Sequence, residues 1–244
     1  MNVFQRTVRI RDCDVAVNRT LRPSCLFSML QEVSIDHTEQ LGAGRDKTLD
    51  RGFLWVLARE SVSIARMPAY DEEVLLESWP GEMMHVLFPR YYRILDKKGE
   101  TLLSASAIWS LIDAETRSLV FPDKAGIRVA GVTTGYELPL PSGIRRQECT
   151  QAGDFTVPYS YTDINGHMSN IYYLDEAENL IPEIACRYAL REIKVEYSHE
   201  IRCGEKMTIS AGRFGSDGYY FSGDGEKHYF SLLLKYQGLE NIIS

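Results

Sequence analysis

Residues 23–42 read PSCLFSMLQEVSIDHTEQLG, and this stretch decides the fold. Its helix-face positions recur every third or fourth residue, at Leu26, Leu30, Val33, His37 and Leu41, which is the spacing of one helix face. The stretch opens on a proline, which suits a first helical turn, and closes on a glycine, which suits a C-terminal cap. The sequence therefore predicts one long amphipathic helix here.

The segments on either side of this helix have the composition of strands. Before it, Val8 and Ile10 alternate with arginines, the period-two pattern of a half-buried strand. After it, segments rich in β-branched and aromatic residues, separated by turn signals, cover residues 53–65, 73–79, 86–95 and 101–112. One helix and a run of antiparallel strands are expected in the first half of the chain.

The same order of elements returns after residues 131–143, whose glycines and prolines are typical of a linker. The pattern predicts a strand over 155–161, a helix over 171–184 that Pro182 interrupts, and strands over 191–201, 206–213, 218–222 and 228–236. Matching positions support a repeat, namely Asp14 with Asp163, Glu73-Val74 with Lys206-Met207, and Gly99-Glu100 with Gly225-Glu226.

The repeat predicts an α+β fold of two tandem hotdog domains, each an antiparallel sheet wrapped around a long helix. We expect an N-terminal hotdog domain over residues 1–138 and a C-terminal one over 139–244. A single hotdog leaves a sheet edge that a second copy covers, and this chain supplies both copies. The protein is expected to be a monomer with an internal pair, or a homodimer. The alternative is two unrelated α+β segments.

Composition excludes several classes of protein. The 244 residues are 44% apolar and 25% charged with a net charge of −7, so neither disorder nor nucleic-acid binding is expected. The five cysteines are widely spaced and form no CxxC pair, which argues against a metal site and favours reduced thiols in the cytoplasm. With no signal-like apolar stretch and no run near ~18 apolar residues, we expect no membrane span.

The two copies differ at polar positions, and these differences indicate a site. When Asp163 is matched with Asp14, Asn165 and His167 fall opposite an alanine and an asparagine. Glu200 falls opposite a methionine, so only the second half keeps a carboxylate there. The candidate catalytic residues therefore belong to the second copy.

The spacing of these residues suits hydrolysis. Asp163, Asn165 and His167 stand at i, i+2 and i+4, so an extended backbone would place them on one face, just before a helix. Backbone N–H groups at a helix N-terminus can bind an oxyanion, and a carboxylate or imidazole can take a proton from water. The ordinary alternative is an Asn-Gly turn next to a helix-capping aspartate.

These motifs resemble those of the acyl-acyl carrier protein (acyl-ACP) thioesterase family, double-hotdog enzymes of plant plastids and bacteria. The resemblance rests on RYYRILDKKGETLLSASAIWSLIDAETR at 90–117, TDINGHMSNIYYLDEAEN at 162–179 and VEYSHE at 195–200. The family pattern D-x-N-x-H-x-x-N maps onto Asp163, Asn165, His167 and Asn170, and Y-x-x-E maps onto Tyr197 and Glu200. Ile201 stands where plant members often have a cysteine, which disfavours a thiol mechanism. Cys203 is expected to be a buried or partly buried thiol outside the site.

The resemblance implies hydrolysis of fatty acyl-ACP thioesters to free fatty acid and holo-ACP, ending chain elongation, without a cofactor or metal. Glu200 or His167 would activate water, Asn165 would position the water or the carbonyl, and Asp163 would orient the others. In an alternative mechanism Asp163 attacks the thioester to give a mixed anhydride. The first domain would be non-catalytic and would tune acyl-chain specificity.

The implied partner is acyl carrier protein with a fatty acyl chain on its 4'-phosphopantetheine arm. Because that partner is acidic, a basic patch is needed, and Arg187, Arg191 and Lys194 are candidates. Three other functions remain open, namely an acyl-CoA thioesterase, a non-catalytic acyl-binding hotdog module and a hotdog dehydratase.

Overall fold

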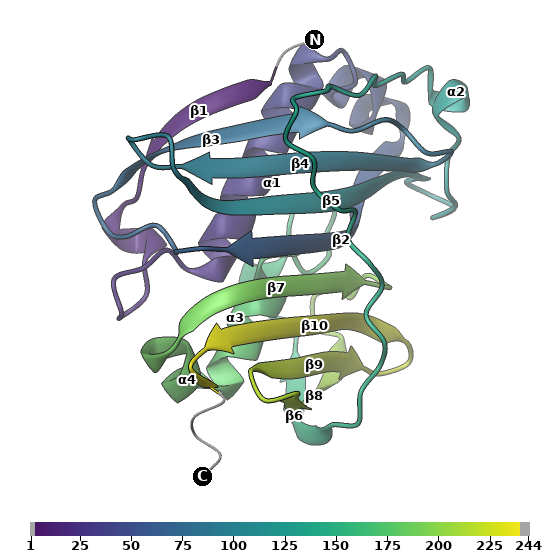
Figure 1. Cartoon of the computed structure of the whole chain (residues 1–244). Helices are drawn as coiled ribbons and strands as arrows, with labels where there is room; N and C mark the ends of the chain where they lie inside the picture. The colour runs from purple at the N-terminus through teal and green to yellow at the C-terminus, as the bar shows by residue number, and fades with distance from the viewer. Residues whose placement is uncertain (1–2, 240–244) are drawn as a thin grey trace.

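A single antiparallel sheet with two helices on one face forms the body of the molecule (Figure 1). This computed structural model describes residues 3–239. The sheet has ten strands in the order β1-β3-β4-β5-β2-β7-β10-β9-β8-β6. Helices α1 and α3 lie on one face, and the segment that joins the two halves crosses the other (Figure 1).

The helices and strands follow one another along the chain in the same order in both halves. The strands are β1 (Phe4–Arg9), β2 (Phe53–Ile64), β3 (Glu73–Pro80), β4 (Leu87–Leu95), β5 (Thr101–Asp113), β6 (Thr150–Thr156), β7 (Ala189–Tyr197), β8 (Lys206–Phe214), β9 (Gly218–Asp224) and β10 (His228–Gln237). The helices are α1 (Pro23–Gln40), α2 (Pro122–Ala125), α3 (Tyr172–Leu180) and α4 (Pro182–Arg187). Short 3-10 turns occupy Asp12–Asp14, Arg45–Lys47, Leu49–Arg51 and Tyr159–Tyr161.

The strand order confirms the predicted pair of hotdogs. Read from either edge, the sheet gives β1-β3-β4-β5-β2 and β6-β8-β9-β10-β7, so corresponding strands occupy corresponding places. The halves meet where β2 pairs with β7, and we call this pairing the seam. A sheet built this way covers at the seam the edge that each half would otherwise expose.

The long helix follows the predicted pattern closely. Helix α1 begins at Pro23, and Gly42, two residues past its end, has a φ of +70°, a left-handed conformation that glycine adopts without strain. Its buried face includes Leu26 and Leu30, which join Leu174 of α3 in one hydrophobic core. The two halves therefore share a core as well as a sheet.

Three predicted elements of the second half are placed differently. The expected strand over 155–161 has the wrong bounds, because β6 runs from Thr150 to Thr156. It stops before Pro158, which has no N–H to donate, and a 3-10 turn follows. The predicted interruption at Pro182 is confirmed, because Pro182 begins a second helix, α4, which runs three residues past the expected end at 184. The expected strand over 191–201 ends at Tyr197.

The early end of β7 matters for the site. The N–H groups of Ser198 and His199 both donate to the carbonyl of Tyr229 (2.8 and 3.3 Å), which breaks the ladder. Glu200 therefore lies on the loop after β7, and strand alternation does not set its direction.

The seam is closed by apolar packing and by one charged cluster. Val62 of β2 lies opposite Ile193 of β7, and both are fully buried. On the same strands the Arg59 guanidinium donates twice to Glu196 Oε1 (2.9 and 2.7 Å), and the Ile144 N–H donates to Glu196 Oε2 (2.9 Å). The joining segment is thereby fastened to the seam that it crosses.

Removing side-chain volume at the seam should destabilise the whole protein. For Ile193→Ala we expect a loss of about 2–5 kcal/mol in the free energy of unfolding, because a fully buried side chain leaves a cavity. Urea denaturation would measure it. Ile164→Ala is the matched control, since Ile164 is 88% exposed. An equal loss in both variants would contradict the assignment of Ile193 to the shared core.

Candidate active site

The segment from Asp163 to His167 is a tight turn, not the extended stretch that the spacing predicts. The Asp163 N–H donates to the His167 carbonyl (2.9 Å), and the Gly166 N–H donates to the Asp163 carbonyl (3.0 Å). Gly166 has a φ of +76°, which the turn requires. Because the chain reverses here, Asp163 and His167 stand on opposite arms of the turn.

Hydrogen bonds in the first half correct the alignment of the two copies. There the Ala16 N–H donates to the Thr20 carbonyl (3.0 Å), the bond that Asp163 and His167 make in the second half. Asp163 therefore corresponds to Ala16, and the match of Asp163 with Asp14 is wrong by two residues.

The corrected alignment changes which residues are particular to the second copy. Asn165 corresponds to Asn18, so the expectation that this asparagine has no counterpart is wrong. His167 corresponds to Thr20. Met168 and Leu21 donate equivalent backbone bonds to Ile201 and Pro68, so Glu200 still corresponds to Met67. In the corrected alignment Asp163, His167 and Glu200 correspond to Ala16, Thr20 and Met67. None of these three first-half residues has a titratable side chain.

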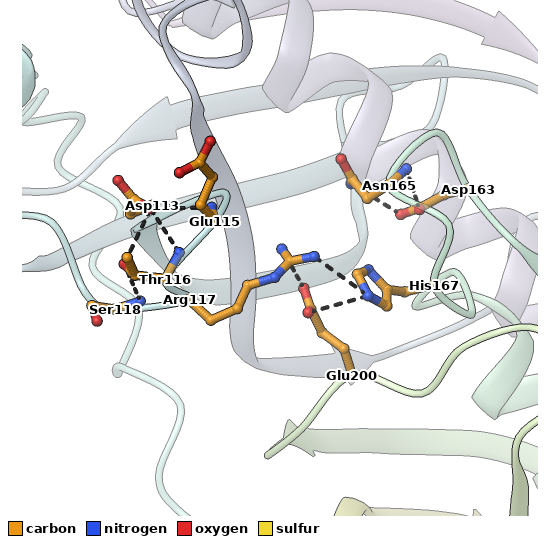
Figure 2. Close-up of polar contacts among 9 residues, drawn as sticks. All are labelled: Asp113, Glu115, Thr116, Arg117, Ser118, Asp163, Asn165, His167 and Glu200. Carbon is orange, nitrogen blue, oxygen red and sulfur yellow. Dashed lines mark hydrogen bonds and ion pairs between the residues drawn. The ribbon is translucent and has the colours of Figure 1, made fainter.

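His167 and Glu200 are brought together by neighbouring backbone segments. His167 forms an isolated antiparallel bridge with Arg202, two residues after Glu200. His167 Nε2 lies 3.5 Å from Glu200 Oε2 (Figure 2). His167 is buried, whereas the Glu200 side chain is 36% exposed. The pair therefore presents one buried base and one carboxylate that solvent can reach.

Arg117 completes this cluster and comes from the other half of the chain. Its Nη2 lies 3.4 Å from His167 Nε2, and its Nη1 lies 3.5 Å from Glu200 Oε1 (Figure 2). Arg117 has a φ of +58° and follows β5, in a turn where Asp113 Oδ1 accepts the N–H groups of Glu115 and Thr116 (3.1 and 2.8 Å).

Sequence reasoning assigned no role to Arg117, although it ends the first-half segment that carries the family resemblance. The other candidates lie at least 46 residues later in the chain, since 163 − 117 = 46, so no local spacing connects them. Only the way the halves are joined places this turn beside His167.

Burial and neighbouring charges set the protonation of His167. Desolvation lowers the pKa of the imidazole, Arg117 and Arg202 lower it further, and Glu200 and Asp163 oppose them by raising it. The Nδ1 atom is buried and has no hydrogen-bond partner among the described residues. The lowered pKa means that the imidazole is neutral near neutral pH. Among the described residues no carboxylate bonds its Nδ1 atom.

Asp163 and Asn165 form a second group beside the first. The Asn165 N–H donates to Asp163 Oδ1 (2.8 Å) and the Asn165 amide nitrogen to Asp163 Oδ2 (3.3 Å) (Figure 2). The Asp163 carboxylate thus stabilises its own turn and makes no hydrogen bond to the His167 side chain. Tyr197, the other matched motif residue, donates its hydroxyl to the carbonyl of Asn170 (2.8 Å), tying β7 to the segment before α3.

Two family descriptions match this chain. The description "Acyl-ACP thioesterase N-terminal domain" matches residues 1–122, and "Acyl-ACP thioesterase C-terminal domain" matches residues 144–236. The chain belongs to the acyl-ACP thioesterase family. The two matched regions correspond to the two halves of the sheet.

Curated relatives are plant proteins of greater length. A chloroplastic acyl-[acyl-carrier-protein] hydrolase of Cuphea viscosissima is 24% identical over 225 residues, covering 86% of this chain and 54% of that protein. A chloroplastic dodecanoyl-[acyl-carrier-protein] hydrolase of Cinnamomum camphora is 26% identical over 236 residues, covering 86% and 60%. The chain therefore spans little more than half the length of these relatives.

Solved structures agree on the fold. An acyl-ACP thioesterase from Bacteroides thetaiotaomicron superposes with a TM-score of 0.86 at 20% identity, over 96% of this chain and 98% of that one. A 12:0-ACP thioesterase from Umbellularia californica superposes with a TM-score of 0.79 at 20% identity, over 96% and 97%. The double hotdog is thus the fold of this chain.

Three further observations concern metal ligands, membrane spans and one cysteine. Within residues 3–239, no cluster of three or more His, Cys, Asp or Glu side chains could hold a metal ion, and no helix is long and apolar enough to cross a membrane. Cys203 is an exposed free thiol, so the expectation that it is buried or partly buried is wrong.

The electrostatics of this site can be measured directly. In Arg117→Ala the pKa of His167 should rise, because a cation that opposes imidazole protonation is removed; in Glu200→Gln it should fall. Titration of the imidazole resonances by NMR, assigned with His167→Ala, measures both changes. Arg128→Ala is the control, because that arginine is exposed and pairs with Asp123. A His167 pKa that stays constant in both test variants would contradict the cluster.

Proposed function

We propose that this protein hydrolyses fatty acyl-ACP thioesters at the cluster of Arg117, His167 and Glu200, releasing free fatty acid and holo-ACP and so ending chain elongation. The observation that carries the proposal is the buried, neutral imidazole beside a solvent-accessible carboxylate. Membership of the family and relatives named acyl-[acyl-carrier-protein] hydrolases support the substrate class.

In this mechanism a water molecule attacks the thioester carbon. His167 Nε2 takes the proton from the water, the C–S bond breaks, and the proton passes to the departing thiolate. Glu200 lies 3.5 Å from Nε2 and stabilises the imidazolium that forms, while Arg117 holds the carboxylate in place. The long separations around Nε2 suit a resting site that tightens when substrate binds.

General-base catalysis by the cluster is favoured over direct attack by Asp163. Both carboxylate oxygens of Asp163 accept hydrogen bonds from Asn165, which lowers their availability as nucleophiles. Asp163 then acts by fixing the turn that presents Asn165 and His167, and Asn165 positions the water or the carbonyl.

We assign the chemistry to the C-terminal domain, residues 139–244, and acyl-chain specificity to the N-terminal domain, residues 1–138, with Arg117 as the first-half contribution to the site. The absence of titratable groups at Ala16, Thr20 and Met67 supports this division. All five cysteines are free thiols, which supports a cytoplasmic location.

The carrier protein would dock beside the site. Two of the three cations expected to hold it are occupied: Arg191 bonds the carbonyl of Ala65 and Gln237, and Lys194 lies 2.7 Å from Glu192. Arg202 is exposed and pairs with His167 through an isolated bridge. We therefore place the docking surface for the acidic carrier protein around Arg202.

Release of free thiol from acyl-ACPs of about 8 to 18 carbons tests the function. We expect turnover by the wild-type protein and a loss of about 10²–10⁴-fold in His167→Ala, because the general base is removed. Thr20→Ala changes the equivalent position of the first half and should leave turnover near the wild-type rate.

The same assay separates the competing functions. Turnover of acyl-CoAs alone would keep the site but discard the carrier protein. Dehydration of 3-hydroxyacyl thioesters without thiol release would indicate a dehydratase. A folded protein that hydrolyses no thioester would refute the enzyme and favour an acyl-binding module.

A further inference from the structure

One carboxyl group is buried at the centre of the molecule. Glu60 of β2 is 3% exposed and lies opposite Val195 of β7 on one side and Ala107 of β5 on the other. It therefore stands on the seam, although the mechanism does not use it.

The side chain of Glu60 points toward the helices. Directly opposed residues of an antiparallel sheet share a face, so Glu60, Ala107 and the next residue in the row, Arg90, point the same way. Arg90 contacts α1 through His37 Nδ1 (3.2 Å) and Thr38 Oγ1 (3.0 Å), which identifies this face. Glu60 thus faces the interior that lies between sheet and helices.

Two polar atoms in this interior lack partners. Glu60 Oε1 and Trp109 Nε1 are buried and make no hydrogen bond within residues 3–239. Trp109 lies two residues beyond Ala107 on the same face, and a diagonal neighbour of this kind is within reach of a long side chain. The Tyr92 hydroxyl, which bonds Ser34 Oγ (2.7 Å), interacts with both side chains, but neither Glu60 Oε1 nor Trp109 Nε1 has a hydrogen-bond partner among the described groups.

The burial of the Glu60 carboxyl group is not compensated by an ion pair within the described residues. Arg90, across Ala107, directs its guanidinium to His37, Thr38 and Ser78, and no salt bridge joins it to Glu60 in the described residues. Burial raises the pKa of Glu60 to about 8, so the group is a neutral carboxylic acid at neutral pH. A neutral acid can both donate and accept a hydrogen bond.

Contacts lead from this region to the candidate active site. Tyr197 lies two residues beyond Val195 on the same strand face, and its ring packs against Tyr173 at 5.4 Å between centroids. Its hydroxyl donates to the carbonyl of Asn170, three residues after His167. From the other side, the turn that carries Arg117 directly follows β5, the strand of Trp109.

We propose that Glu60 and Trp109 form a subsite for a hydroxyl group carried part-way along the acyl chain, so that hydroxyacyl thioesters are substrates of this protein. The hydroxyl would donate to Glu60 Oε1 and accept from the Trp109 indole N–H, satisfying both atoms. The proposal rests on the proposed function, because it assumes that the acyl chain runs from His167 into this interior.

The test compares acyl-ACPs of one length that carry no hydroxyl, or one hydroxyl at successive positions beyond the third carbon. For the wild-type protein we expect kcat/KM to favour the hydroxyl at one position. Glu60→Leu should reduce that preference about tenfold, as loss of one hydrogen bond predicts, and Trp109→Phe should reduce it as well. Glu60→Gln, which still offers an acceptor, should retain most of it.

The second half supplies a matched control. Tyr236 corresponds to Trp109, since the two lie opposite Leu190 and Leu57, and its hydroxyl is likewise buried without a partner in the described chain. Tyr236→Phe should leave the preference unchanged. A preference that is equal in the wild-type protein and Glu60→Leu at every hydroxyl position would overturn the proposal.

A binding measurement separates this proposal from the proposed function. Calorimetry with free hydroxy fatty acids and their unsubstituted analogues needs no turnover, and circular dichroism checks that each variant is folded. Weaker binding of the hydroxy acid alone to Glu60→Leu would support the subsite even if no thioester were hydrolysed. Equal binding of both acids by every variant would count against it even if hydrolysis were confirmed.

Discussion

The pairing of β2 with β7 is the constraint on which the rest of this structure depends. It joins two hotdogs into one sheet and fixes the turn after β5 relative to the loop after β7. Arg117 lies on the first of these and Glu200 on the second. A one-residue slip at the seam would turn every paired side chain to the other face, so the buried pair Val62 and Ile193 also sets the register of the site.

The candidate site combines a buried side chain, His167, with two partly exposed ones, Arg117 and Glu200. This difference in burial affects the protonation of His167. Buried among opposite charges, His167 is held neutral by desolvation and by Arg117, although Glu200 favours its protonation. A proton that reaches Nε2 would meet a carboxylate already oriented by the guanidinium. The net direction is downward, so the charges and the burial together favour the neutral imidazole, and Glu200 limits how far its pKa falls.

Sequence patterns predicted the elements well and their junctions poorly. Periodicity predicted α1, most strands and the duplication, because burial of one face leaves its mark every few residues. The ends of strands and the alignment of one copy with the other depend on backbone hydrogen bonds, which the sequence pattern does not record. Those bonds align Asn165 with Asn18. Of the candidate residues, His167 and Glu200 meet, whereas Asp163 bonds Asn165. Sequence patterns could not indicate Arg117, because it contacts His167 and Glu200 only once the two halves are joined at the seam.

The two copies have diverged in a complementary way. The second half keeps titratable groups at the turn, where the first has Ala16 and Thr20, but at the seam it has Ile193 where the first has Glu60. Neither change follows from stability, since a neutral acid buried without a partner costs folding free energy. A duplicated fold can bear that cost in one half because the other half completes the sheet. The shared core and the candidate site can therefore diverge separately in sequence.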